Sequence, residues 1–182
     1  NYQIIGPSGS GKTTLFDIII GLRSPHQGEV LYNNNFKVPT YKKTNVFYIS
    51  QENSLPNGKF INWFNGSEII EETKKSEIMK LLRQEDLISI LPQDIFNWEI
   101  KDNGKNFSIG QKQRLNILKA IWKKADLVFL DEPTSGLDEK NQDKYLNLII
   151  EKLKNSTIFL ITHREQNLKD FIKLYINDLN KT

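Results

Sequence analysis

The 182-residue sequence contains no cysteine, and this absence excludes several classes of chemistry at once. Disulfide frameworks, thiolate metal sites and cysteine nucleophiles all need a thiol that the chain does not have. A reducing compartment is compatible with this composition.

Long apolar runs are also missing. The longest ones, at residues 18–20 and 127–130, fall far short of the roughly 20 residues that span a bilayer. Any membrane contact must therefore come through another segment or chain. No signal-peptide pattern precedes the first predicted strand, and we expect the natural chain to begin upstream of Asn1.

Charge of one sign is not in excess, because 25 basic residues nearly cancel 22 acidic ones and leave a net charge of +3. This balance gives no polyanion-binding footprint beyond what a nucleotide site needs, so we expect no nucleic-acid partner. The length fits one domain that buries roughly 70% of its unfolded surface.

Short apolar segments alternate with amphipathic ones along the chain, which predicts an α/β fold with a parallel sheet. We expect the segment from 51 to 104, which is richer in helix, to form a helical subdomain. The Asn-rich patch at 33–35 reads as a turn. The predicted strands are 2–5, 46–50, 127–130, 158–162 and a last one near 171–176, and the predicted helices are 12–22, one or two within 68–91, 111–124 and 139–154.

Residues 6–13 read GPSGSGKT and match the eight-residue phosphate-binding loop pattern, between a predicted strand and a predicted helix. Its glycines let backbone N–H groups converge on phosphates at a helix N-terminus. We expect Lys12 to reach the β- and γ-phosphates of a nucleotide and Thr13 to place its hydroxyl on Mg²⁺. The competing interpretation, a Gly/Ser turn with an incidental lysine, needs the spacing and both flanking elements to coincide. The expected nucleotide contacts are Gly6, Ser8, Gly9, Ser10, Gly11, Lys12, Thr13 and Thr14.

Two carboxylates, Asp131 and Glu132, follow the apolar strand 127–130. Ligands bind at the carboxyl ends of strands in open parallel sheets. We expect Asp131 to hold Mg²⁺ through its water shell and Glu132 to polarise an attacking water. Without the phosphate loop, the same pattern would indicate only a strand that leaves the core. A nucleotide switch can work without the second acid, whereas a water-activating base indicates hydrolysis.

With these two Walker motifs, the sequence resembles the ABC ATPase family, whose motifs match in order along nearly the whole chain. The further matches are Gln51 after its strand, FSIGQ at 107–111 with KQR following, SGLD at 135–138, and His163. The resemblance implies that Gln51 is the Q-loop residue, which touches Mg²⁺ and links the site to a partner domain. It implies that His163 is the switch histidine at the γ-phosphate. A lone Gln or His is more often an ordinary polar residue, so the ordered set carries these assignments.

The family's signature motif acts across a dimer, where a Ser hydroxyl and Gly amides at a helix N-terminus cap the γ-phosphate held by the other subunit. Ser108, Gly110 and Gln111 match this motif, and Phe107 replaces the common Leu. Ile109 departs from the usual Gly. A positive φ there would strain Ile, whereas a helical backbone would accept it. An ordinary helix start capped by Ser108 is the alternative interpretation.

Taken together, the resemblance implies a division of roles among the site residues. The implied catalytic residues are Lys12, Glu132 and His163, and the implied metal ligands are Thr13, Gln51 and Asp131. Gln51, Ser108, Gly110, Gln111 and Asp138 join the phosphate-loop residues as implied nucleotide contacts.

Two stretches, 51–61 and 91–104, are similar to the corresponding parts of ABC exporters. The second, with Glu99, Asp102 and Gly104, resembles the exporter X-loop, which touches the intracellular loops of the transmembrane domain. A solvated acidic loop is the rival interpretation.

The resemblance implies a P-loop NTPase fold in a single ABC ATPase domain at 1–182. Its core would be 1–50 and 125–182, and 51–124 would hold the Q-loop, helical subdomain and signature helix. ATP and Mg²⁺ are the implied ligands. The implied partners are a transmembrane domain, on the same or a separate chain, and a second nucleotide-binding domain, identical or different, at the cytoplasmic face of the cell membrane. We expect the family's antiparallel β region and adenine-stacking aromatic residue upstream of the chain, because Tyr2 lies inside the phosphate-loop strand.

The leading hypothesis is an ATP hydrolase that powers transport across a membrane, in the direction of export. A soluble ABC ATPase acting on nucleic acid or the ribosome is the alternative. DNA-end proteins of this type place a long coiled coil before the signature, whereas 14–106 holds no sustained heptads; members that act in translation usually carry two cassettes, which the sequence leaves open. A nucleotide sensor with a crippled site is disfavoured because Lys12, Glu132 and His163 are all present.

Overall fold

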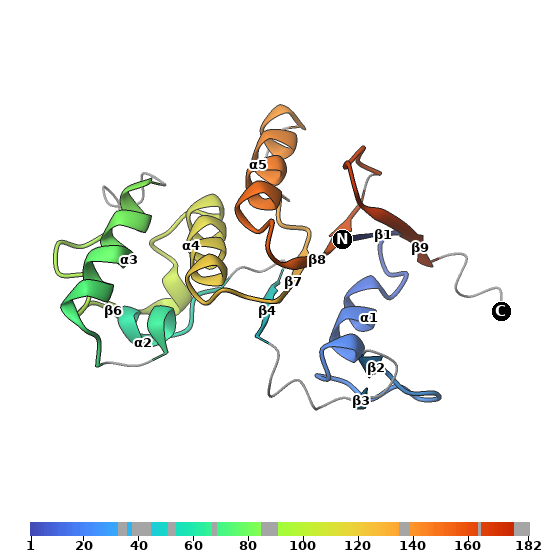
Figure 1. Cartoon of the computed structure of the whole chain (residues 1–182), viewed down its shortest axis with the longest axis horizontal. Coiled ribbons are helices and arrows are strands. Elements are labelled where there is room, and N and C mark those ends of the chain that lie inside the picture. Colours follow the sequence, from blue (N-terminus) through green and yellow to red (C-terminus); the bar gives the residue numbers. More distant parts are fainter. Residues whose placement is uncertain are drawn as a thin grey trace.

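A computed structural model of the chain describes residues 1–32, 36–37, 45–50, 54–66, 69–84, 91–134, 139–163 and 165–176. Within this part, five parallel strands form one sheet in the order β4-β7-β8-β1-β9 (Figure 1). The bounds are β1 Tyr2–Ile5, β4 Val46–Ile49, β7 Leu127–Asp131, β8 Thr157–Thr162 and β9 Ile172–Tyr175. The predicted parallel α/β fold is confirmed.

Helices cover both faces of this sheet, because successive strand residues point to opposite sides. Phe129 packs against Phe16 of α1 (Lys12–Ile19) on one face. Val128 packs on the other face with residues of α4 (Ile109–Trp122) and α5 (Glu139–Lys152). In Figure 1, α1 and α5 accordingly lie on opposite sides of the strands. Strands buried on both faces explain why the sequence shows continuous apolar runs there.

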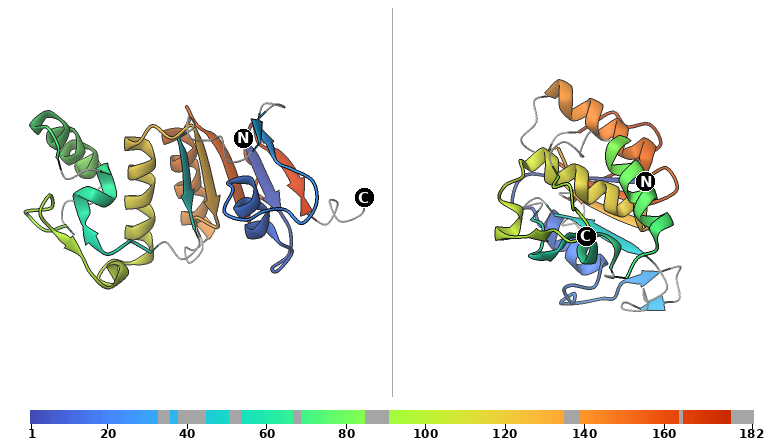
Figure 2. Two further views of the ribbon diagram at one scale, coloured as in Figure 1. Left: turned by 90° about the horizontal axis from the view of Figure 1, so that it is seen from below. Right: turned by 90° about the vertical axis from the view of Figure 1, so that its left-hand side faces the viewer.

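A separate aromatic-rich core lies at one end of the molecule, away from β1 and β9 (Figure 2). The stacked rings of Phe60 and Phe64, with centroids 5.3 Å apart, are fully buried in it. Its elements are α2 (Phe60–Asn65), α3 (Glu72–Gln84), one side of α4, and an antiparallel pair of β5 (Gly58–Lys59) and β6 (Glu99–Ile100), followed by the 3-10 turn η3 (Asp102–Gly104).

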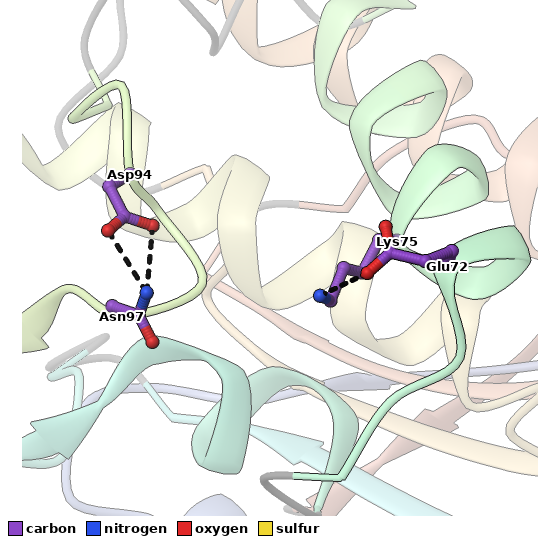
Figure 3. A network of polar contacts seen from close by, with 4 residues as sticks. All are labelled: Glu72, Lys75, Asp94 and Asn97. Atoms are coloured by element: carbon purple, nitrogen blue, oxygen red, sulfur yellow. Dashed lines mark hydrogen bonds and ion pairs between the residues drawn. The ribbon is translucent and has the colours of Figure 1, made fainter.

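One polar pair lies on α3 and another on the turn that precedes β6 (Figure 3). Lys75 bonds Glu72 one turn earlier at 2.6 Å and also lies 5.8 Å from the ring centre of Phe96. On the facing turn, the Asn97 amide donates to both carboxylate oxygens of Asp94. The contact between the Lys75 ammonium and the Phe96 ring therefore connects α3 to this turn.

Several boundaries differ from the predicted ones for local reasons. Helix α1 ends at Ile19 instead of 22, because Gly21 adopts a left-handed φ of 78° and terminates it. Helix α4 begins at Ile109, two residues before the predicted start, because Ser108 caps it. Helix α2 was not predicted, nor was the short antiparallel pair of β2 (Leu31–Tyr32) and β3 (Phe36–Lys37). The predicted turn at 33–35 lies outside the described residues. No helix in the described ranges combines the length and apolarity needed to cross a bilayer.

Candidate functional site

The strand register brings the phosphate loop, the two carboxylates and His163 to one edge of the sheet. Ile5 lies opposite Thr162, Asp131 opposite Ile161, and Ile49 opposite Leu130. Strands β1, β7, β8 and β4 therefore end at nearly the same level. The segments that follow them carry the phosphate loop, the two carboxylates, His163 and the approach to Gln51. This edge is where ligands bind in open parallel sheets.

The phosphate loop, residues 6–13, has the backbone geometry of an anion site. Gly9 and Gly11 adopt left-handed φ values of 76° and 91°, which only glycine takes without strain. Gly11 is the N-cap of α1, and no side chain caps that helix end. The first-turn N–H groups of α1 are therefore available to an anion.

Lys12 is almost completely buried, with 6% of its surface exposed, beneath this loop. Its ammonium donates to the carbonyl oxygens of Gly6 and Pro7, both at 2.8 Å. These bonds hold the side chain along the loop. They use two of the three donors that an ammonium carries.

Ser10 offers a test of whether the loop fits a ligand. Its hydroxyl oxygen is buried and has no hydrogen-bond partner in the described structure. A Cβ placed on Gly6 would approach that oxygen to 2.7 Å, so a larger residue at this position would require the Ser10 side chain to move. A buried polar atom without a partner is what a loop that closes on phosphate oxygens would present. Ser8 and Thr14, two other predicted contacts, are exposed.

Asp131 is buried at the end of β7, with 3% of its surface exposed. One of its oxygens, Oδ2, accepts from the Thr13 hydroxyl at 2.8 Å and from the Tyr48 hydroxyl at 3.3 Å. Burial, followed by the charges of Asp131 and Asp17, raises the pKa of Tyr48 above its ordinary value. Tyr48 therefore stays a protonated donor to the carboxylate.

The pair of Thr13 and Asp131 fits the predicted Mg²⁺. Mg²⁺ prefers oxygen ligands and usually takes one or two carboxylates, with water and substrate phosphates completing its shell. The described ranges contain no cluster of three or more His, Cys, Asp or Glu side chains able to form an all-protein cage. A hydroxyl and one carboxylate beside a phosphate loop match a site in which the protein and the substrate phosphates coordinate Mg²⁺ together.

Glu132 and His163 come together from the ends of two neighbouring strands. His163 Nε2 lies 2.6 Å from Glu132 Oε1, and the two side chains are 51% and 10% exposed. Glu132 has a left-handed φ of 50°, and its N–H donates to Ile161 O at 3.1 Å. Non-glycine residues in this region cost about 1–3 kcal/mol and are found at functional sites. The carboxylate is thus held toward the histidine by a strained backbone.

The start of α4 is a capped helix end, as the alternative interpretation of the signature required. Ser108 Oγ accepts from the Gln111 N–H at 3.2 Å, and the Gln111 side chain accepts from the Ser108 N–H at 2.8 Å. Ile109 is the first helical residue, so its backbone is unstrained, and 58% of its surface is exposed. Figures 1 and 2 place α4 and α1 on either side of β4 and β7, so the signature lies apart from the phosphate loop of its own chain.

The segment predicted to resemble the X-loop has an unusual backbone. Asp102, Asn103 and Gly104 have successive positive φ values of 49°, 54° and 70°. Asn103 donates its N–H to Asn57 Oδ1 at 2.8 Å and accepts from Leu55 N at 3.4 Å. The approach to the signature helix is therefore bonded to the chain that follows Gln51.

Sequence reasoning missed Tyr48, although the alternation within strand 46–50 puts it on the α1 face, where its ring lies 6.4 Å from that of Phe16. Gln51 and residues 135–138, which include Asp138, lie outside the described residues, and their predicted roles stay predictions.

Comparison with known proteins identifies related chains. The lacticin-481/lactococcin-DR transport/processing ATP-binding protein of Lactococcus lactis subsp. lactis is 36% identical over 183 residues, which cover 96% of this chain and 25% of that protein. A putative export ATP-binding/permease protein of Rickettsia prowazekii (strain Madrid E) is 32% identical over 91% of this chain and 29% of its own length. This chain thus spans between a quarter and a third of these curated relatives.

A solved bacterial Atm1-family ABC exporter with ATP bound has the same fold, with a TM-score of 0.72 and 24% identity over 95% of this chain and 31% of that one. The family model described as ABC transporter matches residues 1–135, which include the phosphate loop, the signature and both carboxylates. On the site's geometry and this match, the chain belongs to the ABC transporter family of nucleotide-binding proteins.

Proposed function

We propose that the chain is the ATP-binding and hydrolysing cassette of a membrane exporter, and that it works as one half of a dimer. The observation that carries the proposal is the meeting of Lys12, Asp131 and the Glu132–His163 pair at one edge of the sheet. These groups provide phosphate binding, metal binding and water activation in one place.

Nucleotide binding is assigned to the phosphate loop and Lys12. The loop offers N–H groups at the start of α1, and Lys12 lies beneath it with its ammonium on the carbonyls of Gly6 and Pro7. Thr13 and Asp131 would hold Mg²⁺, together with Gln51 as the resemblance implies. When bound, Mg²⁺ would neutralise charge on the β- and γ-phosphates.

Hydrolysis is assigned to Glu132 with His163. Glu132 would accept a proton from the attacking water, since it is a nearly buried carboxylate held beside the carboxyl edge of the sheet. His163 bonds the same carboxylate at 2.6 Å and is half-exposed, so it can orient Glu132 and also reach the γ-phosphate. Both side chains are positioned by strand ends, which are rigid elements.

The dimer is supported by the position of the signature helix. Ser108, Gly110 and Gln111 lie at a helix N-terminus that is separated from the phosphate loop of the same chain. An exposed helix start of this kind can cap the γ-phosphate of a second nucleotide-binding domain, identical or different.

The link to export rests on the relatives. The L. lactis protein is named for transport and processing, and the R. prowazekii protein for export and as a permease. A transmembrane domain, on the same or a separate chain, is the partner that this proposal requires, and the cassette would lie at the cytoplasmic face of the membrane.

The proposal is tested by ATP hydrolysis with Glu132→Gln in the full-length protein. The amide cannot accept a proton, so turnover should fall by about a hundredfold or more, while ATP binding remains. Sizing with ATP and Mg²⁺ should then detect a nucleotide-bound dimer. Glu151→Gln, an exposed carboxylate on α5, is the matched control and should keep wild-type turnover.

Lys12→Ala should abolish ATP binding, because the main side-chain cation of the loop is lost. Nucleotide titration measures it, and equal affinities in the variant and the wild type would contradict the assignment of the phosphate loop.

Continued hydrolysis by the Glu132→Gln protein would show that another group is the base.

A further inference from the structure

A fully buried amide occupies the second position of β1. Gln3 has 0% of its surface exposed, in a strand whose two faces are both covered. Such strands are normally apolar, and burying an amide costs free energy unless it is hydrogen-bonded. The partners of Gln3 therefore indicate what the residue does.

Those partners lie on β8 and just beyond it. In the amide orientation that satisfies its surroundings, the Gln3 oxygen accepts from the Thr162 hydroxyl at 2.9 Å and from the Gln166 N–H at 3.1 Å. The Gln3 nitrogen donates to the Gln166 carbonyl at 3.1 Å. The register explains the reach, because Gln3 lies opposite Leu160 and Thr162 is the next residue on the same face.

These bonds enclose His163 on both sides. Thr162 directly precedes it and Gln166 follows it three residues later, so one side chain bonds the chain on both sides of His163. On the exposed side, Glu165 bonds Lys173 and the Tyr175 hydroxyl of β9. The buried Gln3 bonds and these surface bonds therefore hold residues on both sides of His163, which contacts Glu132 at 2.6 Å.

We propose that Gln3 is a positioning residue for His163: its bonds to Thr162 and Gln166 hold the histidine so that the imidazole meets Glu132. This role rests on the proposed hydrolysis, because it gives Gln3 an effect on turnover through the Glu132–His163 pair. Removal of the amide leaves the Thr162 hydroxyl and the Gln166 backbone groups without these partners, so the bonds that hold the chain beside His163 are weakened.

The test compares Gln3→Leu with the wild type in the full-length protein. Leu has a similar volume and no polar side-chain atoms, so the strand packing remains. The hydrogen bonds from Gln3 to Thr162 and Gln166, which we call the clamp, are removed. Hydrogen exchange followed by mass spectrometry should show about tenfold faster exchange in peptides that cover 163–168, with little change elsewhere. The kcat for ATP should fall by about tenfold, with ATP affinity changed by less than about twofold.

Two sets of variants separate positioning from stability. Tyr2 lies next to Gln3 on β1, and Tyr2→Leu removes a ring that stacks on Phe159 with centroids 4.8 Å apart. The hydrogen bonds of Gln3 are not removed. It should lower the melting temperature and leave the exchange of 163–168 unchanged relative to the rest of the chain. Thr162→Val removes one clamp bond and should show part of the Gln3→Leu effect, whereas Thr162→Ser keeps the hydroxyl and should restore both exchange and kcat.

Exchange and kcat unchanged in Gln3→Leu would overturn the proposal. So would a loss of kcat with faster exchange spread over β1 and β8, as expected from general destabilisation. If Gln3→Leu fails to fold, the Val and Ser variants at Thr162 decide, and equal kcat in both would overturn it. If the wild type hydrolyses no ATP, the proposed function fails, while the exchange data still report on the clamp.

Discussion

One carboxylate oxygen of Asp131 links helix α1, which follows the phosphate loop, to strand β4. Asp131 Oδ2 accepts from Thr13, on α1, and from Tyr48, on β4, so its second oxygen would face the hydration shell of the proposed Mg²⁺. The Tyr48 hydroxyl bonds the proposed metal ligand Asp131 and would not touch the substrate itself. Groups of this kind orient a metal ligand, and their loss typically weakens metal affinity.

Tyr48→Phe should therefore raise the Mg²⁺ concentration needed for half-maximal nucleotide binding, by about tenfold. The ring and its packing against Phe16 are kept, so nucleotide binding in the presence of a chelator should not change. Nucleotide titration over a series of Mg²⁺ concentrations measures both.

Tyr2→Phe is the control for Tyr48→Phe, because it removes a hydroxyl from a strand tyrosine whose ring stacks on Phe159. An identical Mg²⁺ response in the Tyr48→Phe and wild-type proteins would mean that Tyr48 only fills the core.

At the scale of the element, the start of α4 answers the question that the sequence left open about Ile109. The backbone is helical, so the side chain is tolerated, and it projects from the exposed end of the helix. Crowding against the γ-phosphate of the partner domain is then the remaining effect of this substitution on the proposed composite site.

Ile109→Ala and Ile109→Gly should both raise the ATPase rate of the full-length protein several-fold, and by similar factors. Because the backbone is already helical, removing the side chain is enough, and added φ freedom brings nothing further. Gly should also lower the free energy of unfolding by about 1 kcal/mol relative to Ala. Steady-state hydrolysis and chemical denaturation measure the two effects.

A rise with Gly but not with Ala would indicate that the closed dimer needs a different backbone conformation at this position. Rates unchanged in both variants would mean that Ile109 is accommodated, and pairing with a different cassette would lose its motivation.

The same scale shows how far the sequence could predict the fold. The strands of the main sheet follow from continuous apolar runs, and helices α1, α4 and α5 follow from apolar periodicity over eight or more residues. Helix α2 spans only Phe60–Asn65, and the β5–β6 pair has two residues on each side, so neither gives a periodic signal. The contacts of Tyr48 with Asp131 and of Gln3 with Gln166 depend on strand order, which spacing along the chain does not contain.

At the scale of the whole molecule, one lysine joins the aromatic-rich end to the main sheet. Lys119 of α4 lies 5.5 Å from the ring centre of Phe47, on β4, and 4.8 Å from that of Trp63, on α2. Burial, followed by the charge of Lys123, lowers the pKa of Lys119 to about 8. The unfolded chain holds this proton up to the ordinary lysine pKa, so the charged form weakens the fold at neutral pH.

Above pH 8 the native state loses this proton while the unfolded state keeps it, so the contribution of Lys119 to stability improves as the pH rises toward 10. Lys119→Met removes the titration. The stability of the Met variant relative to the wild type should therefore be highest near pH 7 and decline by pH 10. Chemical denaturation at both values measures it.

Lys80→Met, on the exposed side of α3, is the matched control and should show the same difference from the wild type at both pH values. A Lys119→Met difference that is constant with pH would show that the ammonium is solvated instead of desolvated.

The left-handed backbone of Glu132 has a consequence for which substitutions the protein tolerates. Glycine adopts that conformation freely, so Glu132→Gly should relieve backbone strain, which offsets part of the stability lost with the 2.6 Å contact to His163. A glutamate in a conformation better suited to glycine is consistent with the proposed role of Glu132 as the base, because such strain is found at functional sites.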